Sequence, residues 1–219
     1  MTQLTRRTLL GGTAAAGAAL SVGFNHAAQA AAPPLGKQNA GFYRYKVGDI
    51  EVTVVTDGVN RFKLPDNFVT NVKVDDVKKG LADAHMDTET FNNTYTPIVV
   101  NTGSKLVVID TGTGEANYER SKGAAGQFQA NLKAAGIDRN ALDIALISHF
   151  HGDHINGLLA ADNKPAFPNA EIMVPAAEWK YFMDDGEMAK QTSDRMKGVF
   201  ANLRKVFDAL GRKVTQYEP

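Results

Sequence analysis

The chain has 219 residues and no cysteine, which excludes disulfide bonds and thiolate metal sites. Any bound metal must therefore be held by nitrogen and oxygen ligands. An excess charge of one sign is also lacking, because 24 basic residues balance 24 acidic ones and no long basic block occurs. We therefore expect no nucleic-acid partner. The length suits one medium-sized domain.

Histidine is scarce, yet three of the five histidines lie close together in the stretch His149–His154. No histidine follows His154. Of the other two, His26 lies near the N-terminus and His85 in a segment with helical spacing, where we expect a surface or helix-end position. The sequence thus concentrates its imidazoles at one place.

The first thirty residues have the layout of a secretory leader. Arg6 and Arg7 precede a weakly apolar stretch diluted by glycine, and Ala28-Gln29-Ala30 fits a small-x-small cleavage site. Paired arginines favour the twin-arginine (Tat) route. We therefore expect a signal peptide over residues 1–30, a linker over 31–41, a periplasmic or secreted mature protein, and no membrane span after cleavage.

The remainder alternates strand-like and helix-like patterns. Two hairpins are predicted, the first from 42–47 and 50–56 with a closing turn at Asp57-Gly58, the second from 94–101 and 105–110 with Pro97 at an edge or bulge. Helical spacing marks 74–85, 118–135 and the stretch after Ser193, an expected N-cap. Apolar runs at 143–148 and 170–175 predict buried strands. The order indicates an α/β fold with a mixed sheet.

The histidine cluster follows the strand predicted at 143–148 directly. Alternation along extended backbone puts His149 and His151 on the same side, and Gly152 allows a sharp turn. Asp153 and His154 then lie on the turn or at the start of a helix. Imidazole and carboxylate are ligands for zinc and similar divalent ions. The arrangement can present two neighbouring metal positions, and the alternative is a loop of exposed or capping histidines.

These residues carry a family resemblance. His149-Phe150-His151-Gly152-Asp153-His154 matches the His-x-His-x-Asp-His signature of the metallo-β-lactamase-fold hydrolases, and "NTGSKLVVIDTGTG" resembles their strand-turn-strand ending in Asp-Thr-Gly. With the leader, the chain looks like the secreted branch of methyl parathion hydrolase-like enzymes and quorum-quenching lactonases. Ile155-Asn156-Gly157 departs from the small residue and Gly-Gly of many members. The resemblance runs from about Phe42 to the end.

The resemblance implies the N-terminal part of an αββα sandwich and a role for each matching residue. His149 and His151 would bind one divalent ion, and Asp153 and His154 a second, both expected to be zinc. A hydroxide held by the metals would be the nucleophile, and Asp153 would also orient water or carry a proton. The family's further ligands, a histidine, a bridging aspartate and a last histidine, are not matched. We therefore expect a C-terminally truncated domain over 42–219, which by itself is unstable and poorly active.

Other residues have less specific interpretations. Asp110, at a strand end, is expected to support the metal-binding loop by orienting a metal ligand without binding the metal itself. Phe150 is expected either to contact substrate or to pack beneath the loop. Trp179 is expected to pack in the core on a helix, with an aromatic rim to an apolar leaving-group pocket as the alternative. Asp57 is interpreted as a turn residue, with a second-shell role as the alternative. The stretch around Asp184 is expected to be a polar turn without ligands.

The sequence therefore predicts a metal-dependent hydrolase that cleaves a small ester-like substrate: a lactone, an organophosphate or a related ester. A homodimer is compatible with the sequence. The alternatives are a non-catalytic metal-binding fragment, and a β-lactam hydrolase or an iron-dependent oxidoreductase of the same fold.

Overall fold

The computed structural model describes residue 36 and residues 39–218; the predicted leader over 1–30 lies outside them. In chain order the elements are β1 (Phe42–Val47), β2 (Ile50–Val55), β3 (Gly58–Lys63), α2 (Val74–Asp83), β4 (Thr90–Tyr95), β5 (Ile98–Asn101), β6 (Leu106–Ile109), α3 (Ala116–Arg120), α4 (Phe128–Ala134), η1 (Arg139–Ala141), β7 (Ile144–Leu146), α5 (Gly152–Ile155), η2 (Asn156–Leu158), β8 (Glu171–Pro175), α6 (Ala176–Met183), α7 (Asp185–Ala189), α8 (Asp194–Ala209) and β9 (Thr215–Tyr217). Among the described residues, no helix is both long and apolar enough to cross a membrane.

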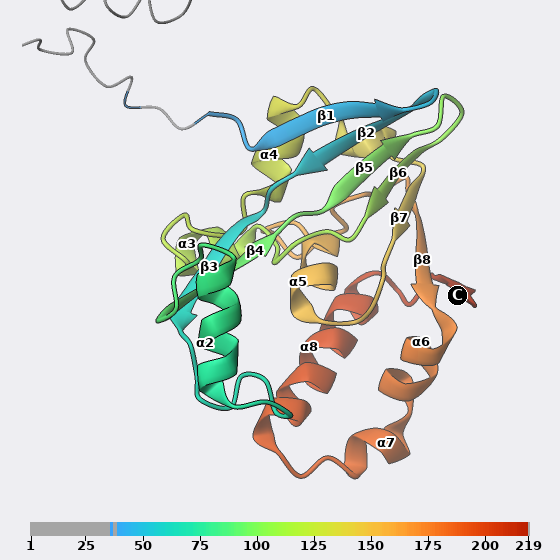
Figure 1. Ribbon diagram of the computed structural model, residues 1–219. Coiled ribbons are helices and arrows are strands. Elements are labelled where there is room, and N and C mark those ends of the chain that lie inside the picture. The colour runs from blue at the N-terminus through green and yellow to red at the C-terminus, as the bar shows by residue number, and fades with distance from the viewer. Residues whose placement is uncertain (1–35, 37–38, 219) are drawn as a thin grey trace, which may run out of the picture. The chain divides into compact units, whose positions relative to one another are not determined.

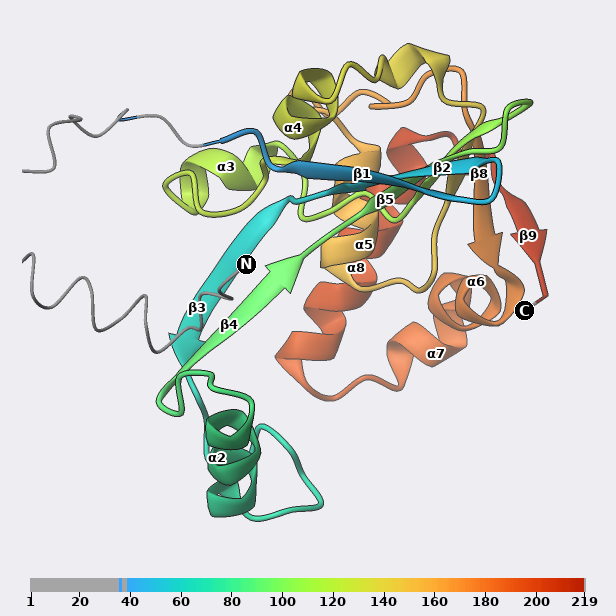
Figure 2. The ribbon, with the colours of Figure 1, turned by 45° about the horizontal axis from the view of Figure 1, so that its top comes forward.

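Seven strands form one mixed sheet in the order β1-β2-β5-β6-β7-β8-β9 (Figure 1). The pairs from β1 to β6 are antiparallel, whereas β6-β7, β7-β8 and β8-β9 are parallel. The last strand, β9, lies beside β8 at the edge of the sheet (Figure 2). The mixed α/β fold expected from the sequence is thus confirmed.

One face of the large sheet forms the core. Thr53, Val99, Val108, Ala145 and Ile172 lie in register across five strands, and all five are buried. The apolar faces of α4, α6 and α8 belong to the same hydrophobic cluster. Four side chains of α8 are buried, each contributing about 1.5–3 kcal/mol of burial free energy.

The opposite face of the sheet is also apolar but less covered. The next row in register consists of Val54, Ile98, Ile109, Leu146 and Met173, and each of these side chains is half-buried. The sheet is therefore apolar on both faces, as expected for a strand layer in the middle of a sandwich.

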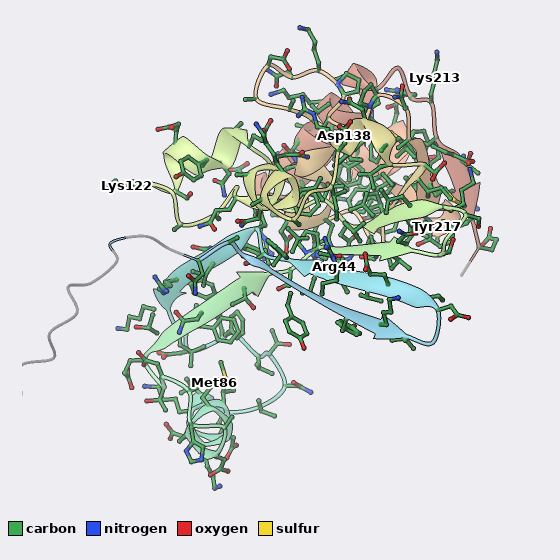
Figure 3. The ribbon with its side chains drawn as sticks, turned by 90° about the horizontal axis from the view of Figure 1, so that it is seen from above. Arg44, Met86, Lys122, Asp138, Lys213 and Tyr217 are labelled. Atoms are coloured by element: carbon green, nitrogen blue, oxygen red, sulfur yellow. The ribbon has the colours of Figure 1, made fainter. Side chains whose placement is uncertain are left out.

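The strand predicted over 94–101 is wrong, because two strands lie there. Thr90–Tyr95 is β4, which pairs with β3 in a separate two-stranded sheet, and Ile98–Asn101 is β5 of the large sheet. Pro97 stands at the break, where a missing N–H ends the ladder. Asp57-Gly58 likewise joins β2 to β3 instead of closing a hairpin. Met86, labelled in Figure 3, lies with α2 and β3–β4, away from the large sheet.

The single helix predicted over 118–135 is also wrong. The chain forms α3 and α4 with an intervening loop, in which Gly123 and Gly126 both have φ near +80°. That left-handed conformation interrupts a helix, and glycine adopts it without steric cost. The predicted end of the helix is confirmed, since Gly136 follows α4 with φ +77°. The stretch around Asp184 was expected to be a turn, but it contains the junction of α6 and α7.

The first hairpin and the last helix are confirmed. β1 pairs with β2 across Gly48-Asp49, with Val47 opposite Ile50. The Ser193 side chain accepts a hydrogen bond from the Met196 N–H and caps α8. Both elements depend on contacts between residues close in sequence.

Acid should weaken the fold in part through Asp143, which precedes β7. The Leu106 N–H donates to its carboxylate at 2.8 Å and Lys105 pairs with it, and these contacts hold the pKa of Asp143 below its usual range. A lowered pKa contributes stability above the unfolded value of about 3.9, and this is lost as the pH falls through the folded value. Urea unfolding at pH 7 and pH 3.5 should therefore show a larger acid loss in wild type than in Asp143→Asn. An equal loss in the two proteins would contradict this assignment.

Candidate metal centre

The carboxyl ends of three neighbouring parallel strands bring the candidate residues together. Asp110 follows β6, the segment His149–His154 follows β7, and α6 begins after β8. Ligand sites in α/β sheets lie at this edge. In Figure 1 the short helix α5, which contains Asp153 and His154, lies beyond the end of β7.

His149 and His151 form the first donor pair. The distance between His149 Nε2 and His151 Nδ1 is 3.0 Å, and their ring centroids are 4.6 Å apart. The Ser148 hydroxyl lies 3.1 Å from His149 Nδ1, which leaves Nε2 facing His151. Two ligand atoms on one tetrahedral zinc lie roughly 3.3 Å apart, since each is about 2.0–2.1 Å from the metal. The two facing nitrogens are close to that separation.

Asp153 and His154 form the second donor pair, at the start of α5. His154 Nε2 lies 3.4 Å from Asp153 Oδ2, again close to the separation of two ligands on one metal. On the opposite side of the ring, His154 Nδ1 lies 2.8 Å from Asp110 Oδ2. A carboxylate on the remote nitrogen is the usual partner of a metal-binding histidine, because it fixes the ring orientation.

The donor set fits two incomplete divalent-metal positions. Each pair contributes two nitrogen or oxygen atoms, and the rings of His149 and His154 are adjacent, with centroids 3.8 Å apart. Within the part of the chain that the structure describes, no group of three or more His, Asp or Glu side chains is arranged to hold one ion. The residues therefore match the expected pairs, and each position requires additional ligands.

The two pairs differ in charge. Burial lowers the pKa of His149, and neighbouring His154 and His151 lower it further, which favours the neutral form of its ring. Burial opposes protonation of His154 as well, but hydrogen bonds with Asp110 and Asp153 raise its pKa to about 9. The hydrogen bond with His154 lowers the pKa of Asp153. A metal at the second pair must therefore displace the proton of His154.

Asp110 owes its position to an unusual backbone conformation. Its φ is +59°, a left-handed value that aspartate tolerates better than most residues. The carboxylate then accepts hydrogen bonds from the Ser148 N–H and the Ser148 hydroxyl, both at 2.8 Å. Next to it, the Thr111 N–H and hydroxyl both donate to the His154 carbonyl, at 2.9 and 2.7 Å. Asp110 and Thr111 thus hold the side chain and the backbone of His154.

Replacing Asp110 with asparagine should weaken metal binding without unfolding the chain. Asparagine tolerates the left-handed backbone, but it removes the charge that faces His154 Nδ1. Zinc affinity, measured by competition with a chromophoric chelator, should fall about 10–100-fold. Asp162→Asn, in a surface loop where Asp162 pairs with Lys164, is the matched control and should bind zinc as wild type does. Equal affinities for all three proteins would contradict the role of Asp110.

Three supporting residues were missed by the sequence analysis. Ser148 contacts Asp110 and both neighbouring imidazoles. Glu178 of α6 accepts a hydrogen bond from the Phe150 N–H at 2.9 Å. The Tyr217 hydroxyl, at the edge seen in Figure 3, donates to the Ile147 carbonyl at 2.9 Å. Only Ser148 could have been found from the sequence, by its place next to His149.

The aromatic candidates lie in the core. Phe150 is 1% exposed and packs between Phe182 and Phe207, with centroid distances of 6.0 and 4.9 Å. Of its two expected positions, the structure therefore shows the one beneath the loop and not substrate contact. Trp179 packs edge-on against Phe207, as expected for a helix-core residue. His85 is exposed just beyond the end of α2.

Comparisons with known proteins agree with this geometry. The sequence model of the metallo-beta-lactamase superfamily matches residues 92–217. The fold is similar to the crystal structure of AbOPH, a hydrolase in the beta lactamase superfamily, with a TM-score of 0.72 and 27% identity over 83% of this chain and 62% of that one. It is also similar to AidC, a dizinc quorum-quenching lactonase, with a TM-score of 0.71 and 25% identity over 81% of this chain and 61% of that one.

A shorter sequence match is to an atrochrysone carboxyl ACP thioesterase of Passalora fulva, 38% identical over 79 residues, which are 36% of this chain and 20% of the thioesterase. The chain thus spans about three fifths of the two solved structures and one fifth of this relative.

Proposed function

Because the chain belongs to the metallo-beta-lactamase superfamily, we propose that its protein is a metal-dependent hydrolase of a carboxylic ester or thioester, with a lactone as the first candidate substrate. The observation that carries the proposal is the arrangement of the two donor pairs at the end of β7. His149 Nε2 faces His151 Nδ1, and His154 Nε2 faces Asp153 Oδ2.

Each residue has a distinct proposed task. His149 and His151 would hold one divalent ion, and Asp153 and His154 the other. When bound, the two ions would act as Lewis acids that polarise the substrate and make water a better nucleophile near neutral pH. The Asp153 carboxylate would orient the water and accept its proton. Asp110 and Ser148 keep the rings of His154 and His149 in place.

Two observations support the proposed substrate class: the activities of the relatives and the charge of the chain. AidC is a lactonase crystallised with a homoserine product, and the Passalora fulva protein is a thioesterase. Both act on acyl groups. The chain has equal numbers of acidic and basic residues, which does not favour a polyanionic substrate. These points support a small acyl substrate. An organophosphate triester is the second candidate, because the sequence resembles the methyl parathion hydrolase-like enzymes.

A substrate panel tests the proposal. The full-length protein, loaded with zinc, should hydrolyse an acyl-homoserine lactone or an aryl thioester faster than a phosphotriester or a β-lactam. The control is the full-length variant in which His149, His151, Asp153 and His154 are all alanine. Rates for this variant equal to those of the zinc-loaded wild-type protein, on every substrate, would contradict a hydrolytic role and favour a non-catalytic metal-binding protein.

A further inference from the structure

We propose that Asp57, far from the histidine cluster in sequence, is a positioning residue for the second donor pair, acting through the loop Asp110–Thr113. The inference rests on the proposed function, because it assigns Asp57 a part in building the metal centre. It differs from a turn role, because the side-chain contacts of Asp57 are not local.

Asp57 is a fully buried carboxylate, 0% exposed, between β2 and β3. Its Oδ2 accepts hydrogen bonds from the N–H and the hydroxyl of Thr113, at 2.8 and 2.7 Å. Its Oδ1 accepts one from the Phe128 N–H at 2.9 Å, at the start of α4. A buried carboxylate is costly unless such partners satisfy it. These three hydrogen bonds join the loop after β6 to a helix of the core.

The carboxylate also packs directly against the loop backbone. A Cβ built on Gly112 would lie 2.6 Å from Asp57 Cγ, so only glycine fits between Asp57 and the loop. Gly112 has φ +77°, a conformation that favours glycine in any case. On the other side, the Gly157 N–H donates to the Gly112 carbonyl at 3.3 Å. The loop is therefore held between Asp57 and the segment that follows His154.

The same loop carries both groups that orient His154. Asp110 lies against its Nδ1, and Thr111 holds its carbonyl through two hydrogen bonds. Since Thr111, Gly112 and Thr113 are consecutive, a displacement of Thr113 must move the residues beside it. Metal affinity is sensitive to such outer contacts, and losing one typically costs about 10–100-fold. Asp57 thus fixes Thr113, which is at the end of the loop farther along the chain from β6.

Three variants separate positioning from stability. Asp57→Asn keeps the shape but places an amide against donor groups. Thr113→Val removes one hydrogen bond to Asp57. It tests the positioning role if Asp57→Asn does not fold. Thr53→Val is the matched control, because it also removes one hydrogen bond of a buried threonine hydroxyl, the one from Arg44 within the β1–β2 hairpin.

Two measurements on the 219-residue chain give the outcome. The first is the NMR signal of the hydrogen-bonded Nδ1 proton of His154 in metal-free protein; the second is zinc affinity by competition. We expect Asp57→Asn and Thr113→Val to lose or broaden that proton signal and to bind zinc about tenfold more weakly. Thr53→Val should leave both readouts unchanged, whatever its effect on thermal stability.

If the proton signal and zinc affinity in Asp57→Asn or Thr113→Val match those of the Thr53→Val control, Asp57 is only structural and the proposal is overturned. Failure of the proposed function can be distinguished from failure of this proposal. If the wild-type chain binds no zinc, the His154 proton signal in metal-free protein still shows whether Asp57 positions His154.

Discussion

In the full-length protein, replacing His151 with alanine is expected to lower hydrolysis of the best substrate in the panel about a thousandfold, equivalent to about 4 kcal/mol of transition-state stabilisation. His151 Nδ1 and His149 Nε2 are the facing atoms of the first donor pair, so the variant leaves one ligand where the chain had two. A divalent ion supplies both substrate polarisation and activated water, and losing it removes both effects. Initial rates at saturating zinc measure the loss.

The control for this variant is His85→Ala. His85 is exposed at the end of α2 and belongs to neither donor pair, so its replacement should leave the rate within about twofold of wild type, as surface changes usually do. Circular dichroism should show that both variants are folded. If His151→Ala is as active as His85→Ala, the first donor pair, His149 and His151, is not needed for hydrolysis.

Replacing Gly157 with alanine is expected to destabilise the fold by about 3 kcal/mol or more, the upper range for overpacking. A Cβ at Gly157 would lie 1.8 Å from the Thr111 carbonyl oxygen, a backbone atom that cannot rotate away. Thr111 is 0% exposed and bonded to the His154 carbonyl, so the displacement would also reach the second donor pair. Urea unfolding measures the stability, and zinc competition measures the effect on the site.

Gly198→Ala is the matched control for the glycine variant. Gly198 is exposed in α8, and no atom lies within 4 Å of a Cβ built on it. Alanine in a helix interior should stabilise the chain by about 0.5–1 kcal/mol. If the two alanine variants unfold at the same urea concentration, the close contact between Gly157 and Thr111 is not a real constraint.

The parts of the fold that the sequence predicted well depend on local chemistry. The hairpin around Gly48-Asp49 and the capped helix after Ser193 are built from neighbours in the chain. The donor pairs are local as well, because alternation along the backbone puts His149 beside His151 and the turn at Gly152 starts α5. Periodicity and turn residues were sufficient for these elements.

The errors arose where distant segments decide the structure. The helix predicted across Gly123 and Gly126 breaks because both glycines adopt left-handed φ values in a loop that packs against β3. The strand across Pro97 divides because its two halves pair with different partners. Partners far apart in sequence cannot be read from the spacing of apolar residues along one segment.

The supporting groups of the candidate site show the same limit. Asp110 was expected to support the metal loop because it ends a strand at the same sheet edge, and the structure places it against His154. Asp57 and Glu178 reach the site only through hydrogen bonds that span 56 and 28 residues. Their positions require the sheet order and the packing of α4 and α6, which the sequence alone does not provide.

The central claim is that the two donor pairs hold two divalent ions. The most direct measurement is anomalous diffraction at the zinc edge from crystals of the chain soaked in zinc. One peak is expected beside His149 Nε2 and His151 Nδ1, and a second beside Asp153 and His154 Nε2. Zinc peaks that lie elsewhere on the protein, with neither pair in contact with metal, would contradict it.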